Sequence, residues 1–330
     1  MKQAFGTTRN GKTIEAITIA KGDLTATLLT LGAIVQDVRL QGTPHSLTLG
    51  SDTLQAYEAD LTYFGALVGP LANRLSNATA PLDGRELQLT ANEGTTSLHG
   101  GPNGIHQEVW AVSEQASDSV TLTLNLPDGK GGYPGNRVIT ARYTITADAQ
   151  LTLEISATTD AATLINIANH SYWNLDGTAT IKNHALTVPA HSYIPVDAQH
   201  IPTGIAPVEG TGFDLRDGGT LGLPEGQRLD HNLCLNGAEG DLKLACTLTG
   251  QSGLSMSIET TEIGLQVFDA APISSGVFNG HTGAPYGPFC GVALEAQRWP
   301  DAPNQTGFPS CELRADETYQ QTTRWTFFRA

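Results

Sequence analysis

Basic side chains are scarce in this sequence. Its 330 residues include 18 Lys and Arg against 33 Asp and Glu, which gives a formal net charge of −15 at pH 7. Proteins that bind nucleic-acid backbones or anionic membrane surfaces present positive patches, and this composition works against them. We therefore expect no nucleic-acid and no membrane partner, and a neutral or cationic small molecule as the ligand.

Long apolar segments and paired cysteines are also missing. No run approaches the roughly 20 apolar residues of a membrane span. The stretch MKQAFGTTRNGKTIEAI at the start has no apolar core of a signal peptide. The four cysteines, at positions 234, 246, 290 and 311, form no CxxC motif, which is typical of buried, reduced thiols. We therefore expect a cytoplasmic protein.

Motifs for metal and dinucleotide chemistry do not occur either. The sequence has no HxH, no HExxH and no His/Cys pair at metal-ligand spacing, so we expect no metal site. The glycine-rich stretch PDGKGGYPGN, at 127–136, has Pro134 where a dinucleotide fingerprint needs its third glycine. It also lies between two strand-like segments instead of before a helix. We expect no cofactor.

Alternation of apolar and polar residues is the main pattern that the sequence does contain. Successive side chains of a half-buried strand point to opposite faces, so apolar residues recur at every second position. This pattern, rich in Thr and Val, occurs at residues 119–126, 137–146, 149–156 and 253–260. Turn-forming stretches separate the runs, and residues 51–60 are a weak candidate for a short turn of helix.

Many short strands with little helix predict an all-β fold. The 15% of charged residues and the 36 glycines disfavour a helix-rich protein, whose exposed faces usually carry Glu, Lys and Arg. A chain of this length buries a large core, and a large antiparallel β-sandwich of two sheets is the natural packing. No linker-like segment interrupts it, so we expect residues 1–330 to form a single domain.

The stretch NHSYWNL, at 169–175, is unusually polar for a segment between strand-like runs. Such a cluster is costly to desolvate unless it is hydrogen-bonded or functional. Two interpretations stay open: a binding surface for a ligand with hydroxyls and apolar faces, or an internally bonded cluster at a turn.

Four other stretches combine polar side chains with turn residues or a strand. They are GPLANRLSN at 69–77, TSLHGGPNG at 96–104, RLDHNLCL at 228–235 and GVALEAQRWPDAPN at 291–304. In the second, the two glycines after His99 let the backbone approach a ligand closely. In the last, Glu295 shares a strand face with Ala293 and Gln297. Each stretch also has a plain structural interpretation, such as a capped turn or a solvated strand face.

Taken together and in order, these stretches resemble the aldose 1-epimerase (galactose mutarotase) family. The ordered set is ANRL, LHGG, NHSYWNL, LDHNL, LQVF and ALEAQRWPDAPN, and it spans roughly residues 65 to 304. The opening segment GKTIEAITIAKGDLTATLLTLGAIVQDVRL is also similar to the start of that family. Each motif is weak alone, whereas the ordered set is specific.

The resemblance implies a β-sandwich of the galactose mutarotase-like type and interconversion of the α and β anomers of free aldohexoses. It implies that His170 is the general acid and Glu295 the general base. It also implies substrate-binding positions, with Ser171 and Tyr172 beside the acid helping to shape the site. These positions are Asn73, Arg74, His99, Ser171, Tyr172, Asp230 and Gln266.

The sequence departs from the family pattern at three places. Pro70 stands where the family usually has Arg, Asp269 to Pro272 replace a Thr-Gly-Asn turn, and Trp173 replaces Phe. These departures bear on the wall of the pocket, and hence on sugar specificity, more than on the acid and the base.

Mutarotation requires two proton transfers and neither a redox step nor a covalent nucleophile. A base takes the proton of the O1 hydroxyl while an acid protonates the ring oxygen O5. We expect the imidazole of His170 and the carboxyl of Glu295 to face one another across a cavity wide enough for a pyranose. Tyr172 or Trp173 is expected to lie against the apolar face of the sugar ring.

Three alternatives stay open. A related protein acting on another sugar or a sugar phosphate would need clustered basic residues, and only Arg74 falls in a motif. A non-catalytic sugar-binding module would not need a matched acid and base. A glycoside hydrolase would use Asp230 and Glu295 as its paired carboxylates. The preferred aldose, and the choice between monomer and homodimer, are left open.

Overall fold

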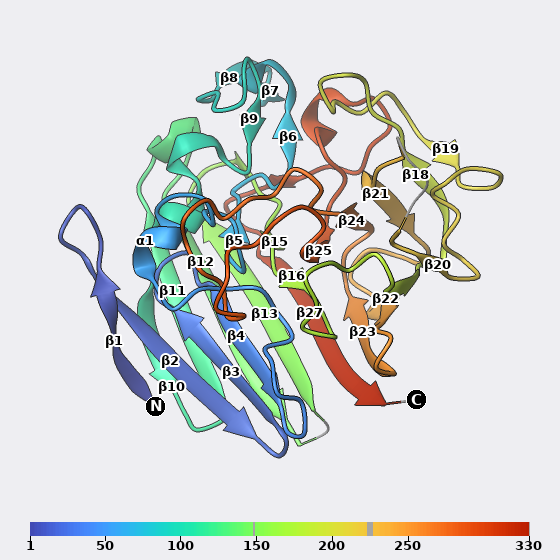
Figure 1. Ribbon diagram of the computed structural model, residues 1–330. Helices are drawn as coiled ribbons and strands as arrows, with labels where there is room; N and C mark the ends of the chain where they lie inside the picture. Colours follow the sequence, from blue (N-terminus) through green and yellow to red (C-terminus); the bar gives the residue numbers. More distant parts are fainter. Residues whose placement is uncertain (148, 223–226, 330) are drawn as a thin grey trace.

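Antiparallel strands supply nearly all of the regular structure. The computed structural model describes residues 1–147, 149–222 and 227–329 (Figure 1). The largest sheet has nine strands in the following order: β10 (Ala111–Gln115), β11 (Ser119–Leu126), β12 (Arg137–Thr146), β13 (Gln150–Thr159), β27 (Tyr319–Arg329), β23 (Leu254–Thr260), β22 (Lys243–Thr249), β17 (Ala185–Thr187) and β20 (Gly219–Thr220).

A six-stranded sheet carries much of the candidate site. Its order is β16 (Tyr172–Trp173), β25 (Val292–Gln297), β24 (Gly264–Phe268), β21 (Asp230–Leu235), β18 (Ala190–Ile194) and β19 (Ala206–Pro207). A four-stranded sheet follows chain order: β1 (Lys2–Thr7), β2 (Thr13–Lys21), β3 (Leu24–Leu29) and β4 (Val35–Leu40). Short pairs complete the fold: β5 (Leu67–Val68) with β15 (Ala168–Asn169), β6 (Arg74–Leu75) with β9 (Ser97–Leu98), β7 (Thr79–Leu82) with β8 (Arg85–Gln88), and β14 (Thr163–Leu164) with β26 (Glu312–Leu313).

The alternation read from the sequence matches the strands closely. The runs at 119–126 and 137–146 coincide with β11 and β12, which pair in register from Ser119 opposite Thr144 to Leu126 opposite Arg137. In β12 the odd-numbered side chains are buried and the even-numbered ones are exposed or half-buried. The predicted helical turn is confirmed as α1 (Leu54–Tyr57).

The main core joins the nine-stranded sheet to the six-stranded sheet and also contains buried residues of the four-stranded sheet. One cluster of buried side chains includes Leu122, Leu153 and Trp325 from the first sheet and Leu265 and Leu294 from the second. Both sheets therefore place one apolar face on a shared core, as a sandwich requires. The all-β sandwich predicted from the sequence is confirmed.

The first hairpin contains a misleading match. The expectation from the sequence is that it contains no phosphate-binding loop, yet residues 6–13 read GTTRNGKT, which fits the letters of that motif. Such a loop needs a helix after it, because the helix N-terminus supplies the N–H groups that bind phosphate. Here strand β2 follows and pairs back on β1, with Thr7 opposite Thr13. The match is therefore a turn of a β-hairpin.

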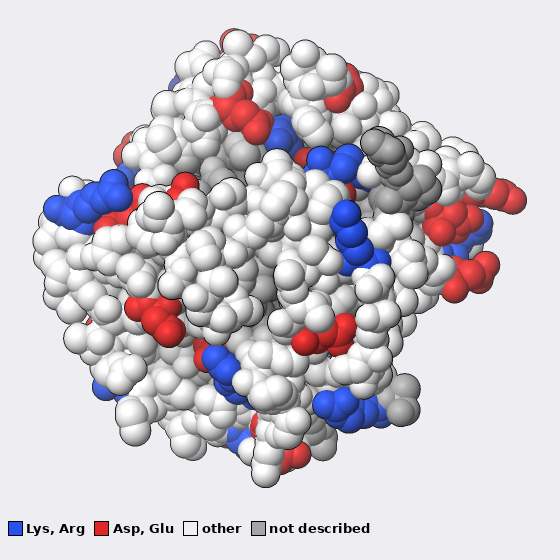
Figure 2. All heavy atoms as spheres, viewed as in Figure 1, with Lys and Arg blue, Asp and Glu red and all other residues white. Residues whose placement is uncertain are grey.

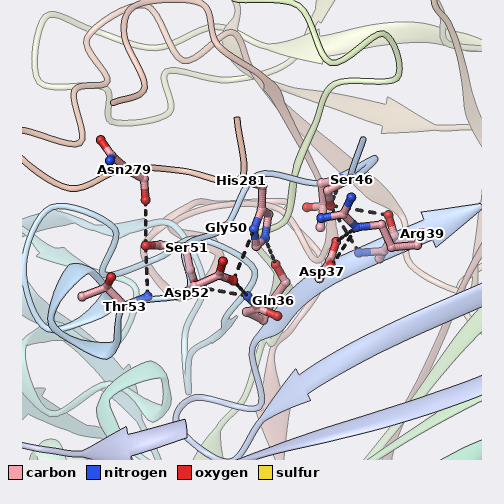
Figure 3. A network of polar contacts seen from close by, with 12 residues as sticks. Gln36, Asp37, Arg39, Ser46, Gly50, Ser51, Asp52, Thr53, Asn279 and His281 are labelled. Carbon is pink, nitrogen blue, oxygen red and sulfur yellow. Dashed lines mark hydrogen bonds and ion pairs between the residues drawn. The ribbon is translucent and has the colours of Figure 1, made fainter. Parts of the chain in front are cut away.

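A polar network joins the long connection between β24 and β25 to strand β4 of the four-stranded sheet and to the segment that follows it (Figure 3). The Nε2 atom of His281 lies 2.8 Å from the carbonyl oxygen of Gln36, and the Ser51 hydroxyl donates to the carbonyl of Asn279 at 2.8 Å. The Gln36 amide in turn donates to the carbonyl of Ser51 at 3.1 Å. This network fixes the path of the chain between the two strands that carry Gln266 and Glu295.

Charged side chains are scattered over the face that Figure 2 shows, and the basic ones form no broad patch there. Within the described ranges, no helix has the length and apolar character that crossing a bilayer demands.

Candidate active site

His170 and Glu295 are far apart in the sequence and meet through strand pairing. Two residues after His170, strand β16 pairs with β25, with Tyr172 opposite Ala293. The Nε2 atom of His170 lies 3.6 Å from Oε1 of Glu295, and both side chains are buried. The expectation that they face one another across a pyranose-wide cavity is wrong. They lie side by side, a placement suited to two oxygens bound to the same carbon atom.

The register of the six-stranded sheet places three predicted residues on one face. Gln266 is opposite Glu295, and the Nε2 group of Gln266 donates to Oδ1 of Asp230 at 2.8 Å. Their neighbours Leu265 and Leu294 belong to the core cluster on the other face. Because side chains alternate along a strand, the core residues fix which way Gln266 and Glu295 point.

Arg74 and Asp230 form the half-buried edge of the site. The Arg74 side chain is 14% exposed and that of Asp230 is 17% exposed, and Nη1 of the first lies 3.8 Å from Oδ2 of the second. Arg74 also donates through Nε and Nη2 to Glu93, at 2.6 and 3.0 Å. His200 lies with Nδ1 3.4 Å from Oδ2 of Asp230. Sequence reasoning missed Glu93 and His200, which stand in no recognisable motif.

His99 is held in one tautomer by a backbone amide. The N–H of Asn73 donates to Nδ1 of His99 at 3.1 Å, and the N–H of His99 donates back to the Asn73 carbonyl at 3.0 Å. Since Nδ1 must offer a lone pair, the neutral ring carries its proton on Nε2. His99 therefore acts as a hydrogen-bond donor, and Asn73, whose side-chain oxygen accepts the Arg74 N–H at 2.8 Å, positions both neighbours.

The same tautomer bears on metal binding. One ligand atom each of His99, His170 and Glu295 lie within 4.8 Å of one another, a set of residue types that metals favour. Coordination by Nε2 of His99 would require moving its proton to Nδ1, where the Asn73 N–H points. The arrangement therefore suits hydrogen bonding to a neutral ligand better than coordination of a metal ion.

The side chains of the three residues after His170 lie in different environments. The ring of Tyr172 lies 5.0 Å from that of His170 and stacks on Phe64 at 4.2 Å, so it supports the site from behind. Trp173 packs in the core against Trp325, at 5.9 Å, so the expectation that it contacts the sugar is wrong. The Ser171 hydroxyl is buried, and among the described residues it has no hydrogen-bond partner.

The asparagines of NHSYWNL have structural partners. The Asn169 amide donates to the Gly65 carbonyl at 3.0 Å, and the Asn174 amide donates to the carbonyls of Thr178 and Cys290 at 2.7 and 2.8 Å. The interpretation as an internally bonded cluster is confirmed for the two asparagines, and the one as a binding surface stays a prediction. The asparagines are an internally bonded scaffold, and His170 is the group that they present.

Burial sets the protonation of the central pair. It lowers the pKa of His170 to about 4, because an imidazolium loses its hydration there. Burial also raises the pKa of Glu295 well above its ordinary value, and the charge of Asp230 adds to this while Arg74 opposes it. The buried pair therefore favours the neutral state, with an uncharged imidazole and a protonated carboxyl.

Two aromatic residues at the site were not predicted. Phe268 is half-buried at the end of β24, opposite Asp230, and its ring lies 6.2 Å from that of Tyr172 in an edge-on contact. Tyr63 lies beside three histidine rings. Sequence reasoning quoted the LQVF motif that ends in Phe268, and alternation from Gln266 would have assigned Phe268 to the same face.

The two glycines after His99 serve chain packing. A Cβ atom on Gly100 would lie 2.1 Å from the carbonyl oxygen of Gly69, and one on Gly101 would lie 2.5 Å from that of Thr90. The sequence predicted that these glycines let the backbone approach a ligand closely. In the structure they instead leave room for the carbonyl groups of Gly69 and Thr90, so the segment before Arg74 packs against the segment of His99.

The departure at Asp269 to Pro272 also has a structural role. The buried carboxylate of Asp269 accepts two hydrogen bonds from Nε and Nη2 of Arg228, at 2.9 and 2.7 Å, and one from the Leu229 N–H at 3.0 Å. This contact fixes the segment that leads into Asp230, so it sets the position of a residue of the candidate site.

His106, next to the site, gives a prediction for pH. Burial, followed by the nearby His170, lowers the pKa of His106 to about 4. The unfolded chain binds this proton near pH 6.5 and the folded chain does not, so the stabilisation is lost as the pH falls from about 6.5 to about 4. Relative to His106→Asn, the parent should lose about 2 kcal/mol of unfolding free energy between pH 7 and pH 5. Urea unfolding at both pH values measures this, and parallel pH curves for the two proteins would contradict it.

Comparison with known proteins identifies the family of this chain. The family model for aldose 1-epimerase matches residues 15–326. The galactose mutarotase of Homo sapiens is 36% identical over 327 residues, covering 96% of this chain and 95% of that protein. The aldose 1-epimerase of Escherichia coli K12 is 33% identical, with 92% of each chain covered.

Solved structures show the same fold. An aldose epimerase homologue from C. elegans superposes with a TM-score of 0.89 at 32% identity, covering 96% of this chain and 99% of that one. A galactose 1-epimerase from Lactobacillus acidophilus superposes with a TM-score of 0.86 at 27% identity, covering 100% and 98%. The β-sandwich is therefore of the galactose mutarotase-like type, and the chain belongs to the aldose 1-epimerase family.

Proposed function

We propose that this protein is an aldose 1-epimerase that interconverts the α and β anomers of free aldohexoses such as galactose and glucose. The observation that carries the proposal is the buried pair of His170 and Glu295, whose Nε2 and Oε1 atoms lie 3.6 Å apart. Two groups so placed can reach O1 and O5 of one sugar at the same time, because both oxygens are bonded to C1. The family relationship supports the same reaction.

The reaction balances with one proton passing through each group. Glu295 takes the proton of the O1 hydroxyl, His170 gives a proton to O5, and the C1–O5 bond breaks to leave the open-chain aldehyde. Rotation about C1–C2 presents the other carbonyl face. Closure then returns the proton of O5 to His170 and that of Glu295 to O1, which yields the opposite anomer.

The pKa values of the pair fit this cycle. After ring opening Glu295 is protonated and His170 is neutral, which is the state that burial favours by lowering the pKa of His170 and raising that of Glu295. Before ring opening the shared proton must lie on His170, and this ion pair of imidazolium and carboxylate is the state that burial disfavours. The free site must therefore first pass one proton from Glu295 to His170, whose Nε2 lies 3.6 Å from Oε1 of Glu295; burial then favours both transfers that open the ring.

The surrounding side chains suit a neutral polyol. The carboxylate of Asp230 accepts hydrogen bonds from sugar hydroxyls, and Arg74 and the Nε2–H of His99 donate them. Gln266, which donates to Asp230 at 2.8 Å, holds that carboxylate in place. The half-buried ring of Phe268 is placed to lie against the apolar face of the pyranose. Asn73, Ser171 and Tyr172 shape the site from behind these groups.

The alternatives have less support. A phosphate group would need a free cation, whereas Arg74 at the site is already paired with Glu93 and lies near Asp230. Hydrolysis by Asp230 and Glu295 would leave His170 without a function beside Glu295. A cytoplasmic location is also part of the proposal, supported by the four buried and unpaired cysteines.

Polarimetry tests the proposed function directly. Freshly dissolved α-galactose and α-glucose should reach anomeric equilibrium much faster with the protein than without it, and xylose, arabinose and fructose define the preferred sugar. Nitrophenyl galactoside and glucoside should stay intact. Rates equal to the spontaneous rate for every sugar would refute the epimerase, and release of nitrophenol would favour a hydrolase.

A further inference from the structure

The orientation of the His170 imidazole has no obvious source in hydrogen bonding. Its Nε2 atom faces Glu295, and its Nδ1 atom is buried without a hydrogen-bond partner among the described residues. A functional imidazole is commonly held by a hydrogen bond to the nitrogen that does not react. Packing must therefore fix the angle of this ring.

Aromatic rings surround His170 on several sides. The Tyr63 ring is nearly parallel to it, with an interplanar angle of 21° and centroids 5.9 Å apart. Tyr172 lies 5.0 Å away at 38°, and His99 meets it edge-on at 5.1 Å and 77°. Of these three rings, that of Tyr63 is the closest to parallel with the imidazole.

Tyr63 also contacts the other histidines near the site. Its ring centroid lies 4.8 Å from that of His99 and 4.9 Å from that of His106. The residue comes shortly before β5, which pairs with β15 ahead of His170, with Leu67 opposite Asn169. A small buried cluster of Val68, Ala72 and Ala168 packs against it. The position of Tyr63 relative to His170 is thus set by a strand pair and by apolar packing.

We propose that Tyr63 is a positioning residue for His170, its stacked ring replacing the hydrogen bond that Nδ1 lacks. The inference rests on the proposed function, since it concerns the same imidazole. The ring fixes the angle at which Nε2 meets the reacting oxygen, and it keeps water from the buried face of the imidazole. Tyr172 meets the imidazole at the larger angle of 38° and is itself buried against Phe64.

The titration of His170 reports on this screening. Its pKa is about 4 because the ring is buried. The titratable groups that face it from the surrounding segments are Glu295, His99, His106, Tyr63 and Tyr172. None of them except Tyr63 changes in the variants below, so a shift of the pKa of His170 measures the loss of the Tyr63 ring.

Removal of the ring is the decisive experiment. In Tyr63→Leu we expect kcat for galactose mutarotation to fall about 10- to 100-fold, the range expected for a misplaced catalytic group, with KM changed less than about threefold. An NMR titration of the His170 ring, assigned with His170→Asn, should show its pKa rising toward about 6.5. Tyr63→Phe keeps the ring and should retain kcat within about threefold of the parent.

A matched control separates positioning from general destabilisation. Phe5→Leu removes another half-buried aromatic ring, which packs near Tyr57 at 6.3 Å, and should leave both kcat and the titration unchanged. If Tyr63→Leu does not fold, Tyr63→Met supplies a flexible apolar replacement without a ring. An unchanged titration of His170 in the ringless variant, or equal losses in the Phe and Leu variants, would overturn the proposal. A parent protein without mutarotase activity would refute the proposed function, while the titration would still decide the role of Tyr63.

Discussion

Glu295→Gln and His170→Asn should each lower kcat for mutarotation by about 10² to 10⁴, the range typical of a positioned acid or base. Glutamine keeps the shape of glutamate but cannot take the proton of O1. Asparagine keeps a polar side chain but cannot protonate O5 and recover that proton. Because both transfers belong to one cycle, the double variant should lose little more than either single variant.

Polarimetry on fresh α-galactose, with circular dichroism as a check on folding, measures these effects. Glu259→Gln and His191→Asn are matched controls, because Glu259 is paired on the outer sheet face with Arg324 at 3.5 Å and His191 is exposed. Both controls should retain the parental rate. Near-parental kcat in the Glu295 and His170 variants would show that other groups move the protons.

Asp301→Ala should lower the free energy of unfolding by about 3 kcal/mol, since hydrogen bonds to a charged group contribute about 1.5 to 3 kcal/mol each and are not additive. The carboxylate of Asp301 is 3% exposed. It accepts from the backbone and hydroxyl of Ser76, at 3.0 and 3.1 Å, and from the side-chain amides of Asn304 and Gln305, both at 2.8 Å. Removing it deprives the half-buried donors of Ser76 and Gln305 of this acceptor.

Urea unfolding of Asp301→Ala measures the loss. Asp83→Ala is the matched control, because Asp83 forms an exposed ion pair with Arg314 and such pairs contribute at most about 1 kcal/mol. Ser76 lies two residues after Arg74, so Asp301→Ala should also raise KM by loosening the edge of the site. Equal free energies of unfolding for the two variants would show that the hydrogen bonds of Asp301 in the PDAPN stretch do not stabilise the fold.

The strands were largely predictable, because burial on one face of a sheet forces alternation along the chain. The run at 137–146 became β12 with the same bounds. Pairs such as β5 with β15 are two residues long and carry no alternation of their own. These short pairs form only because the larger sheets bring the two segments of each pair next to one another. That residues 1–330 form one domain stays a prediction.

The sequence predicted which residues form the candidate site better than it predicted how they are arranged. The motifs brought His99, His170, Asp230, Gln266 and Glu295 into one set, and the structure places these residues together. Trp173 was assigned to the pocket and lies in the core, because the residue after Tyr172 on β16 must face the opposite side. Tyr63 and Glu93 were missed, since their contacts with His170 and Arg74 join segments that no spacing rule connects.

The sequence by itself determined the class of fold and the acidic net charge, since both depend on residue type and local pattern, and its resemblance to the family implied the roles proposed for His170 and Glu295. Only the tertiary structure decided that His170 and Glu295 lie side by side, that a backbone amide selects the tautomer of His99, and that burial favours a neutral pair. The physical reason is that distances, tautomers and desolvation arise between residues remote in the chain. No local pattern contains them.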